Sequence, residues 1–250
     1  KLFRAGIGTN NVDHCARLCH ASTVTGLGMA FGSGAMTNSI QGIRDADCIL
    51  ITGSNTAESH PVISYEVVRA VKKGASLVII DPRRIPMVDH ATLWLQPTPG
   101  TDIYVFLAMA HVILREGWGD LAFMETRTEG FAEFAAGLEG YTPEVAALHS
   151  GVPAEKIELA ARLYALGQKA NEIERLGDYE INPAAQSLNP SIPQSLNPSI
   201  SRGHSCILYA MGITQRTNGT DLVLALANLS LLTGQIGKHG TGINPLRGQS

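Results

Sequence analysis

The sequence predicts an α/β fold in which a doubly wound, mostly parallel sheet of the dinucleotide-binding type is covered by helices, giving three αβα layers. Two observations support this prediction. Short, continuous apolar runs recur along the chain, each ending at glycine or at polar residues, and longer segments with helical spacing of apolar side chains lie between them. Continuous apolar runs are typical of strands buried on both faces, and their alternation with helices is typical of parallel sheets.

The first βαβ unit spans residues 47–80. Residues 47–53 (DCILITG) form an apolar run that predicts a buried strand. Pro61 suits the first turn of a helix, apolar side chains then follow helical spacing over residues 62–73, and Gly74 ends the helix. Residues 76–80 (SLVII) predict the second strand. We expect the crossover between these parallel strands to be right-handed.

The rest of the chain continues the same alternation, with proline at the first turn of two helices. The predicted elements are a short strand over residues 92–95, an apolar helix over 102–116, helices that open at Pro143 and Pro153, a strand over 206–211 and a helix over 221–233.

Residues 171–204 interrupt this pattern. Within them, QSLNPSIP at 186–193 is followed by QSLNPSIS at 194–201, which differs at one position. The prolines of this segment exclude a regular helix or a central strand. We therefore predict a low-complexity loop inserted into the domain, at a small thermodynamic cost because loop closure grows only logarithmically with length.

Composition and charge exclude several classes of function. The chain of 250 residues is 44% hydrophobic and 16% charged, which is typical of a globular core. Its net charge is −3 without a block of Lys or Arg, so we expect no nucleic-acid partner. The apolar runs are shorter than the ~20 residues that span a bilayer, so we expect no direct membrane insertion. Four scattered cysteines do not form a disulfide framework, which favours a reducing compartment.

Both ends of the sequence suggest a piece of a longer protein. The chain begins at Lys1 instead of Met, and it stops directly after the glycine-containing segment 242–249. We interpret residues 1–250 as one domain of a larger multidomain protein.

The first candidate site is the segment that contains Cys15, Cys19 and His20. A thiol beside an imidazole can serve as a soft metal ligand with a proton acceptor in reach. One interpretation is a reactive or metal-bound thiolate at Cys19, favoured by a helix N-terminus that would follow it. A structural zinc site would need a second pair of Cys or His ligands, which the sequence lacks at suitable spacing. The third interpretation is two ordinary cysteines at the start of a helix.

Polar loops follow three of the predicted strands, at residues 53–60, 81–83 and 100–102. Ligands bind at the carboxyl ends of strands in open parallel sheets. Asn55, Ser59 and helix-start amides could hold phosphate, Asp81 could accept from a ribose hydroxyl, and Asp102 from guanine ring nitrogens. The alternative is that Asn55 and Asp102 only cap turns and helices. Neither a Gly-x-Gly-x-x-Gly nor a Walker motif follows the first strand, so an ordinary NAD or ATP site is not supported.

The last candidate segment, residues 234–249, is a glycine-rich loop with a single arginine, Arg247. A guanidinium group can bind a small carboxylate through two parallel hydrogen bonds. The alternative is an ordinary surface arginine.

Together these motifs resemble the catalytic α subunit of formate dehydrogenases in the molybdopterin oxidoreductase family. The resemblance covers nearly the whole chain apart from the inserted loop, and the motifs occur in the family's order. The matching segments are residues 9–20 (TNNVDHCARLCH), 32–38 (GSGAMTN), 53–55 (GSN), 58–61 (ESHP), 81–83 (DPR), 127–130 (RTEG), 211–215 (MGITQ) and 242–249 (GINPLRGQ).

The resemblance implies roles for individual residues. Cys19 matches the position that holds Cys or selenocysteine and ligates molybdenum or tungsten, and His20 matches the active-site histidine beside it. Relatives that reduce nitrate commonly place Met after that cysteine, so His20 favours formate. Arg247 matches the arginine that faces formate. Contacts to one of two molybdopterin guanine dinucleotides (bis-MGD) are implied for Asn55, Glu58, Ser59, Asp81, Arg83, Gly100, Asp102, Gly212, Gln215 and Gln249.

The resemblance also implies an activity and partners. Formate would be oxidised to CO₂, or CO₂ reduced, and the electrons would pass to domains or subunits that carry iron–sulfur clusters. Residues 1–250 match the dinucleotide-binding domain, while the family's N-terminal [4Fe–4S] domain and its C-terminal domains lie outside this chain. We therefore expect the isolated chain to be inactive. The alternatives are a related molybdopterin oxidoreductase with another substrate, or a non-catalytic nucleotide-binding module. We expect a cytoplasmic enzyme, or a periplasmic one if an export signal precedes this segment.

Overall fold

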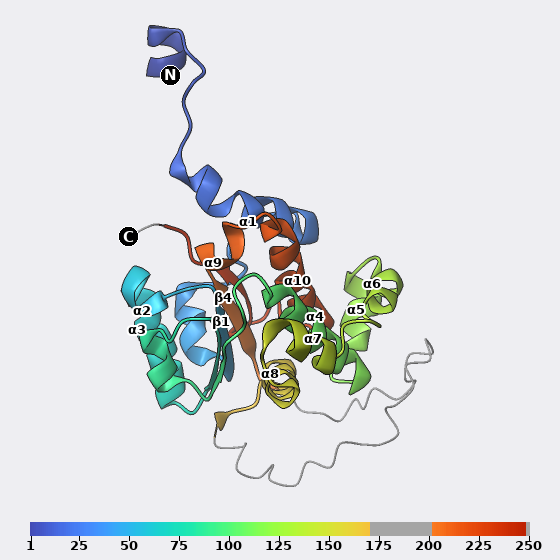
Figure 1. The fold of residues 1–250 in the computed structure, drawn as a ribbon. Coiled ribbons are helices and arrows are strands. Elements are labelled where there is room, and N and C mark those ends of the chain that lie inside the picture. The colour runs from blue at the N-terminus through green and yellow to red at the C-terminus, as the bar shows by residue number, and fades with distance from the viewer. Residues whose placement is uncertain (171–201, 249–250) are drawn as a thin grey trace.

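The computed structural model describes residues 1–170 and 202–248 and contains a five-stranded, all-parallel sheet (Figure 1). The spatial order of the strands is β3-β2-β1-β4-β5. Successive strands extend the sheet on one side of β1 and then on the other, which is doubly wound topology. The strands are β1 (Cys48–Thr52), β2 (Ser76–Ile80), β3 (Leu93–Leu95), β4 (Ser205–Tyr209) and β5 (Gly242–Pro245).

Helices cover both faces of this sheet, so the predicted three-layer α/β fold is confirmed. Strands β1, β2 and β4 are buried along their whole length, and alternate side chains enter two separate cores. Leu50 lies in the core under α4, α8 and α10, whereas its neighbour Ile51 lies in the core with α3. Burial on both faces explains why these strands are continuously apolar.

The helices flank the sheet in the order that the chain alternation predicts. They are α1 (Cys15–Phe31), α2 (Thr56–Ser59), α3 (Pro61–Lys72), α4 (Asp102–Arg115), α5 (Leu121–Arg127), α6 (Phe131–Gly137), α7 (Pro143–Ser150), α8 (Ala154–Leu166), α9 (Met211–Thr214) and α10 (Gly219–Leu232). Three short helical turns complete the described elements: η1 (Leu2–Ile7), η2 (Ile40–Asp45) and η3 (Pro86–His90).

Most predicted elements are confirmed within a few residues, but two expectations were wrong. The segment 234–249 is not only a loop, because Gly242–Pro245 forms β5 and pairs with β4 along its length. The helix near Cys19 starts at Cys15 instead of after Cys19. Its backbone is broken at His20, however, where φ is −137° and ψ is 21°, so a second helical segment does begin beside Cys19.

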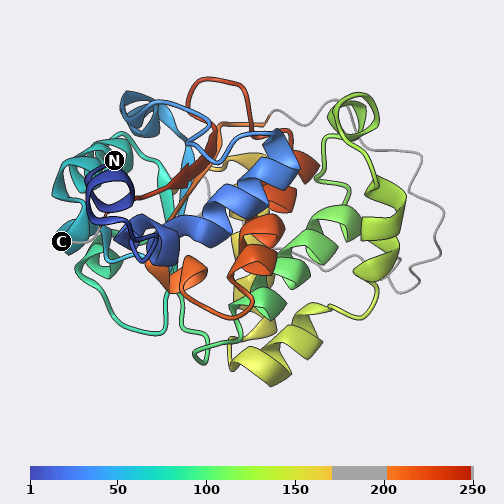
Figure 2. The same ribbon diagram turned by 90° about the horizontal axis from the view of Figure 1, so that it is seen from above.

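Helix α1 lies beside α10 near the carboxyl edge of the sheet (Figures 1 and 2). Glycine permits this close packing, because a Cβ atom at Gly26 would lie 2.7 Å from Cγ1 of Val223 in α10. The N-terminal segment that contains η1 extends away from the sheet and contributes no buried residue in η1. Helix α1 therefore reaches the ends of β4 and β5, where the candidate site lies.

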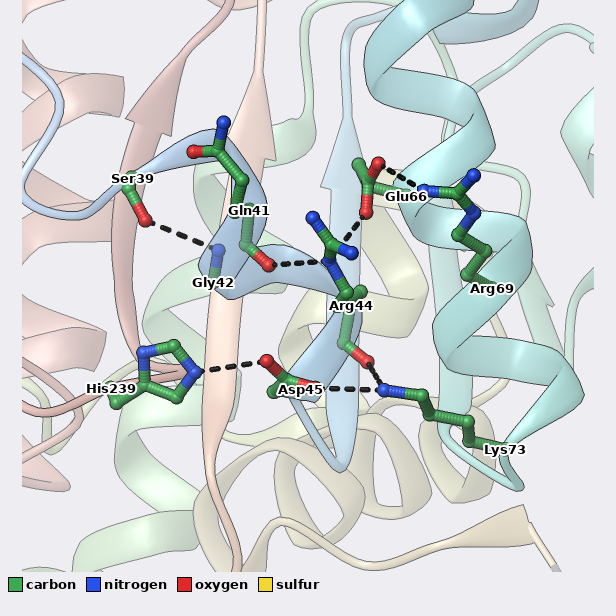
Figure 3. Close-up of polar contacts among 9 residues, drawn as sticks. All are labelled: Ser39, Gln41, Gly42, Arg44, Asp45, Glu66, Arg69, Lys73 and His239. Carbon is green, nitrogen blue, oxygen red and sulfur yellow. Dashed lines mark hydrogen bonds and ion pairs between the residues drawn. The ribbon is translucent and has the colours of Figure 1, made fainter.

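The amino edge of the sheet is held by ion pairs (Figure 3). Glu66 of α3 is largely buried and lies 2.8 Å from Arg69 and 2.9 Å from Nε of Arg44 in η2. Asp45 accepts from Lys73 at 2.8 Å and pairs with His239 at 2.9 Å, and these two contacts lower the pKa of Asp45 to about 2. These contacts join η2, α3 and the segment before β5.

The inserted loop predicted over residues 171–204 lies outside the described residues except at its end. Gly203 donates its backbone N–H to the carbonyl of Leu166 at 2.8 Å, and His204 donates to Oδ2 of Asp47 at 2.9 Å. Among the described residues, no helix has both the length and the apolar character that a membrane span requires.

Candidate functional site

The candidate site residues lie along one edge of the sheet. All five strands are parallel, so the segments that follow them emerge at the same carboxyl edge. The chain leaves β1 towards α3 on one face and leaves β4 towards α10 on the other. The boundary between β1 and β4 is therefore the topological switch point, where open α/β sheets bind ligands.

Two glycines meet at this switch point. Gly212, after β4, donates its N–H to the carbonyl of Gly53, after β1, at 3.0 Å. A Cβ atom at Gly212 would lie only 2.7 Å from Cα of Gly53, and Gly53 itself has a φ of +55°. Side chains are thus excluded from both positions, and backbone lies at the surface where a flat ligand could approach it.

Asn55 has a side chain whose polar atoms could contact a ligand. It precedes α2, but its side chain makes no capping hydrogen bond. Its Oδ1 and Nδ2 atoms are both shielded from solvent without a hydrogen-bond partner. A buried polar group normally has a partner, so the capping interpretation of Asn55 is not supported, and its two unpaired atoms suit contacts to a ligand.

Cys19 and His20 are both buried in α1 and lie next to the end of β5. Nε2 of His20 is 3.1 Å from the carbonyl oxygen of Leu246, and Nδ1 is 3.0 Å from Oγ1 of Thr23. The carbonyl of Cys19 accepts a hydrogen bond from Oγ1 of Thr214 in α9. Burial lowers the pKa of His20; the Leu246 contact opposes that shift, and the nearby positive groups Arg247 and His60 reinforce it.

Arg247 follows β5 and is tied to the rest of the site by hydrogen bonds. Its guanidinium group donates to the carbonyl of Gly34, and its own carbonyl lies 3.2 Å from Nε2 of His60. His20 contacts the preceding carbonyl, that of Leu246. Two histidines from different segments thus contact successive carbonyls, which places Arg247 beside the Cys19–His20 pair despite its exposed side chain.

Asp81 and Asp102 lie at the other end of the edge, after β2 and at the start of α4. Burial raises the pKa of Asp81, and the backbone N–H of Arg83, at 2.8 Å from Oδ1, opposes that shift. Oδ2 of Asp102, which is almost completely buried, forms an ion pair with Arg216. The capping interpretation of Asp102 is therefore replaced by an ion pair that joins α4 to the segment before α10.

The remaining predicted residues lie around this edge. Glu58 and Ser59 belong to α2, and their N–H groups donate to the carbonyl of Asn55. The residues Arg83, Gly100 and Gln215 are exposed in the segments after β2, β3 and β4. Gln249 lies outside the described residues.

Several residues of this edge were not predicted as site residues. Nδ1 of His60 and Oδ1 of Asn244 are buried without a hydrogen-bond partner, like the amide of Asn55. Arg216 became visible only through its pairing with Asp102. His60 carried a signal in the sequence, since it belongs to the ESHP segment beside Asn55. Asn244 lies in β5, the strand that the sequence did not reveal.

Comparison with known proteins agrees with this geometry. A family model described as molybdopterin oxidoreductase matches residues 1–248. The whole chain is 47% identical to the F420-dependent formate dehydrogenase 1 subunit alpha of Methanococcus maripaludis and 43% identical to the F420-dependent formate dehydrogenase subunit alpha of Methanocaldococcus jannaschii. It is 38% identical to formate dehydrogenase H of Escherichia coli.

The chain spans about a third of the length of these relatives, 32%, 32% and 30% respectively. A solved structure, acetylene hydratase from Pelobacter acetylenicus, superposes on 95% of this chain and 27% of its own with a TM-score of 0.72. At 23% identity this likeness shows the fold alone.

The resemblance predicted from the motifs is therefore confirmed. The match over residues 1–248 and the relatives at 38–47% identity show that this chain belongs to the molybdopterin oxidoreductase family, and membership implies a molybdopterin cofactor with molybdenum or tungsten.

Proposed function

We propose that this chain is the dinucleotide-binding domain of a molybdenum- or tungsten-dependent formate dehydrogenase, and that it binds one of two molybdopterin guanine dinucleotides. The observation that carries the proposal is the placement of Cys19, His20 and Arg247 together at one end of the carboxyl edge. The names of the relatives, which are formate dehydrogenase subunits, support formate as the substrate.

The metal-ligating side chains of this site fit a metal that takes most of its ligands from a bound cofactor. No group of three His, Cys, Asp or Glu residues in the described part of the chain could hold a metal ion. A protein-only zinc or iron site is therefore unsupported there. One buried thiol at Cys19 suits a metal whose other ligands come from cofactor sulfur atoms, because soft thiolate ligands favour such metals.

The edge also fits an extended dinucleotide. Asp102 and Asp81 follow β3 and β2 at one end, Asn55 and Gly212 lie at the switch point, and Arg247 follows β5. Adjacent strands lie ~4.8 Å apart, so these contacts extend over ~19 Å of the edge. We place the guanine nucleotide towards Asp81 and Asp102, the pterin near Gly212 and Gln215, and the metal at Cys19.

Different residues of this chain would have different roles in the reaction. When bound, the metal cofactor accepts the two electrons that leave formate as it becomes CO₂ and a proton. Arg247 would bind the carboxylate through its guanidinium group and offset its negative charge. His20, next to Cys19, would orient the substrate through the Leu246–Arg247 segment that its Nε2–H holds, or would accept the proton at Nδ1 when the Thr23 contact opens. Burial of His20 and Cys19 keeps bulk water away from this point.

We place the partners of the reaction outside this chain. The electrons would pass to domains or subunits with iron–sulfur clusters, including a [4Fe–4S] cluster in the parent protein. The isolated chain lacks those groups and would not turn over formate. We further propose a cytoplasmic enzyme.

The experiment that tests this function uses the full-length protein that contains this chain. We expect molybdenum or tungsten together with molybdopterin guanine dinucleotide in the purified protein, and formate-dependent reduction of a viologen dye. Arg247→Gln should raise KM for formate at least about tenfold through loss of the charged contact, whereas Arg84→Gln, an exposed arginine after β2, should leave KM unchanged. Cofactor-loaded protein without formate oxidation would contradict formate as the substrate and favour another substrate of the family.

A further inference from the structure

A chain of buried hydroxyl groups stands behind His20. The phenol of Tyr209, at the end of β4, donates to Oγ1 of Thr23 at 3.0 Å, and the same Oγ1 atom lies 3.0 Å from Nδ1 of His20. Tyr209 and Thr23 are completely buried, and His20 is 2% exposed. The three side chains come from β4 and α1, and the fourth member, the Leu246 carbonyl, follows β5.

For a neutral His20, the chemistry of these groups gives a direction to each hydrogen bond. A carbonyl oxygen only accepts, so the proton between His20 and Leu246 must lie on Nε2. In the neutral imidazole the other nitrogen, Nδ1, then carries a lone pair and accepts. Thr23 must therefore donate its hydroxyl proton to Nδ1, which leaves its oxygen free to accept from Tyr209. The opposite tautomer would set two lone pairs against each other at Leu246.

We propose that Thr23 and Tyr209 are positioning residues, which hold His20 in its Nε2–H tautomer with Nε2 directed at the Leu246 carbonyl. This proposal deepens the proposed function, on which its catalytic consequence rests. The hydroxyl of Thr23 selects this tautomer of His20, because a methyl group of the same size would fill the space without donating a hydrogen bond to Nδ1. The hydroxyl of Tyr209 strengthens the chain by occupying an acceptor site on Thr23 that a helix carbonyl cannot use.

The arrangement predicts which kinetic constant depends on the hydrogen bonds from Tyr209 to Thr23 and from Thr23 to His20. Arg247 is also held by the Gly34 carbonyl and by His60, neither of which involves Thr23. Loss of the Thr23 hydroxyl should therefore leave KM for formate within about threefold of the wild-type value. The turnover number should fall about 10–100-fold, the range typical when a partner that orients an active-site histidine is removed.

The test compares Thr23→Val with Thr23→Ser in the full-length, cofactor-loaded protein. We expect the valine variant to lose turnover and the serine variant, which keeps the donor, to recover most of it. Tyr209→Phe should shift turnover in the same direction by a smaller factor. Tyr164→Phe is the matched control, because Tyr164 is another completely buried tyrosine, whose hydroxyl lies 3.1 Å from Ser230 away from His20. It should leave both kinetic constants unchanged.

A second readout does not depend on turnover. In protein labelled with ¹⁵N at histidine, the His20 signals are identified by their absence in His20→Gln. We expect one protonated nitrogen, Nε2, and a hydrogen-bonded lone pair on Nδ1 in the wild-type protein and in Thr23→Ser. Thr23→Val should shift the Nδ1 signal towards that of an unbonded lone pair, while Tyr164→Phe leaves it in place.

Unchanged His20 signals in Thr23→Val would overturn the proposal, as would equal losses of turnover in the serine and valine variants. Failure of the proposed function looks different. In that case the wild-type protein would not oxidise formate, while the ¹⁵N spectra would still report whether Thr23 sets the tautomer.

Discussion

The contact between Gly53 and Gly212 shows how single residues shape the candidate site. Both positions exclude a side chain, one by φ of +55° and both by the approach of the other backbone. The sequence placed Gly53 at the end of a strand and Gly212 after another, but it could not show that the two would touch. That contact depends on the pairing of β1 with β4, which are separated by more than 150 residues. His60 and Arg216 were missed for a similar reason, since their partners, Arg247 and Asp102, are distant along the chain.

A methyl group at Gly212 tests this contact. Gly212→Ala would place Cβ 2.7 Å from Cα and 2.8 Å from the carbonyl oxygen of Gly53. We expect a loss of about 1–3 kcal/mol in the free energy of unfolding, the usual cost of overpacking. Gly28→Ala in α1 is the control, because its Cβ would meet no atom within 4 Å. Alanine there should be neutral or stabilise by up to ~1 kcal/mol. Urea unfolding measures both free energies of unfolding. Equal losses in the two variants would contradict the close contact between Gly53 and Gly212.

Among the helices and strands, the sequence predicted those that local apolar patterns determine and missed those that depend on tertiary contacts. Strands β1, β2 and β4 are buried on both faces and are therefore apolar without interruption, which made them recognisable. Strand β5 (GINP) contains glycine, asparagine and proline, and it is a strand because β4 offers it an edge to pair with. Likewise, the break in α1 at His20 follows no local signal. It coincides with a tertiary contact of the imidazole to the Leu246 carbonyl and with a local one to Thr23 in the same helix.

The contact between α4 and the end of α6 predicts a pH dependence. His111 of α4 is buried, and its Nδ1 lies 3.1 Å from the carbonyl of Leu138. Burial lowers the pKa of His111 below its usual value of 6.5, although the Leu138 contact opposes the shift; the charge of Arg115 lowers it further and that of Glu144 raises it. The unfolded chain then binds more protons than the folded chain between the two pKa values, so stability rises with pH in this window.

The corresponding measurement compares wild-type protein with His111→Leu. The wild-type contribution of His111 should be complete above pH 6.5 and should decline as the pH falls towards the lower, folded pKa. We therefore expect the free energy of unfolding of the wild-type protein, minus that of His111→Leu, to fall between pH 7.5 and pH 5. A value that stays constant, or that rises as the pH falls, would show that His111 is not held neutral.

In the whole molecule, the described residues on both sides of segment 171–201 contribute strands to one five-stranded sheet. The two flanks of this segment meet, because Gly203 bonds to Leu166 and a Cβ atom at Gly167 would lie 2.4 Å from the carbonyl carbon of Gly203. Strand β4 follows directly after these flanking contacts and pairs with β1 on one side and β5 on the other. The repeated sequence at 186–201 signalled an insertion, and the alternation of strands and helices on both sides identified the fold around it.

Replacement of residues 171–201 by a Gly-Ser linker of about six residues tests that interpretation. The flanks already meet through the hydrogen bond from Gly203 to Leu166, so a short linker should connect them. The shorter loop should raise the free energy of unfolding by about 1 kcal/mol through its smaller closure entropy. Urea unfolding and cofactor content of the full-length variant are the measurements. A variant that fails to fold, or that loses its cofactor, would show that the segment contributes contacts of its own.

The proposed chemistry depends on a bond between the sulfur of Cys19 and the metal of the cofactor. X-ray absorption at the molybdenum or tungsten edge of the full-length, cofactor-loaded protein would detect this bond. We expect Cys19→Ser to lose one sulfur neighbour of the metal, while Cys15→Ser, at the exposed cysteine four residues away, retains the wild-type spectrum. A sulfur count that Cys19→Ser leaves unchanged, in protein that still holds its metal and pterin, would show that Cys19 is not a metal ligand.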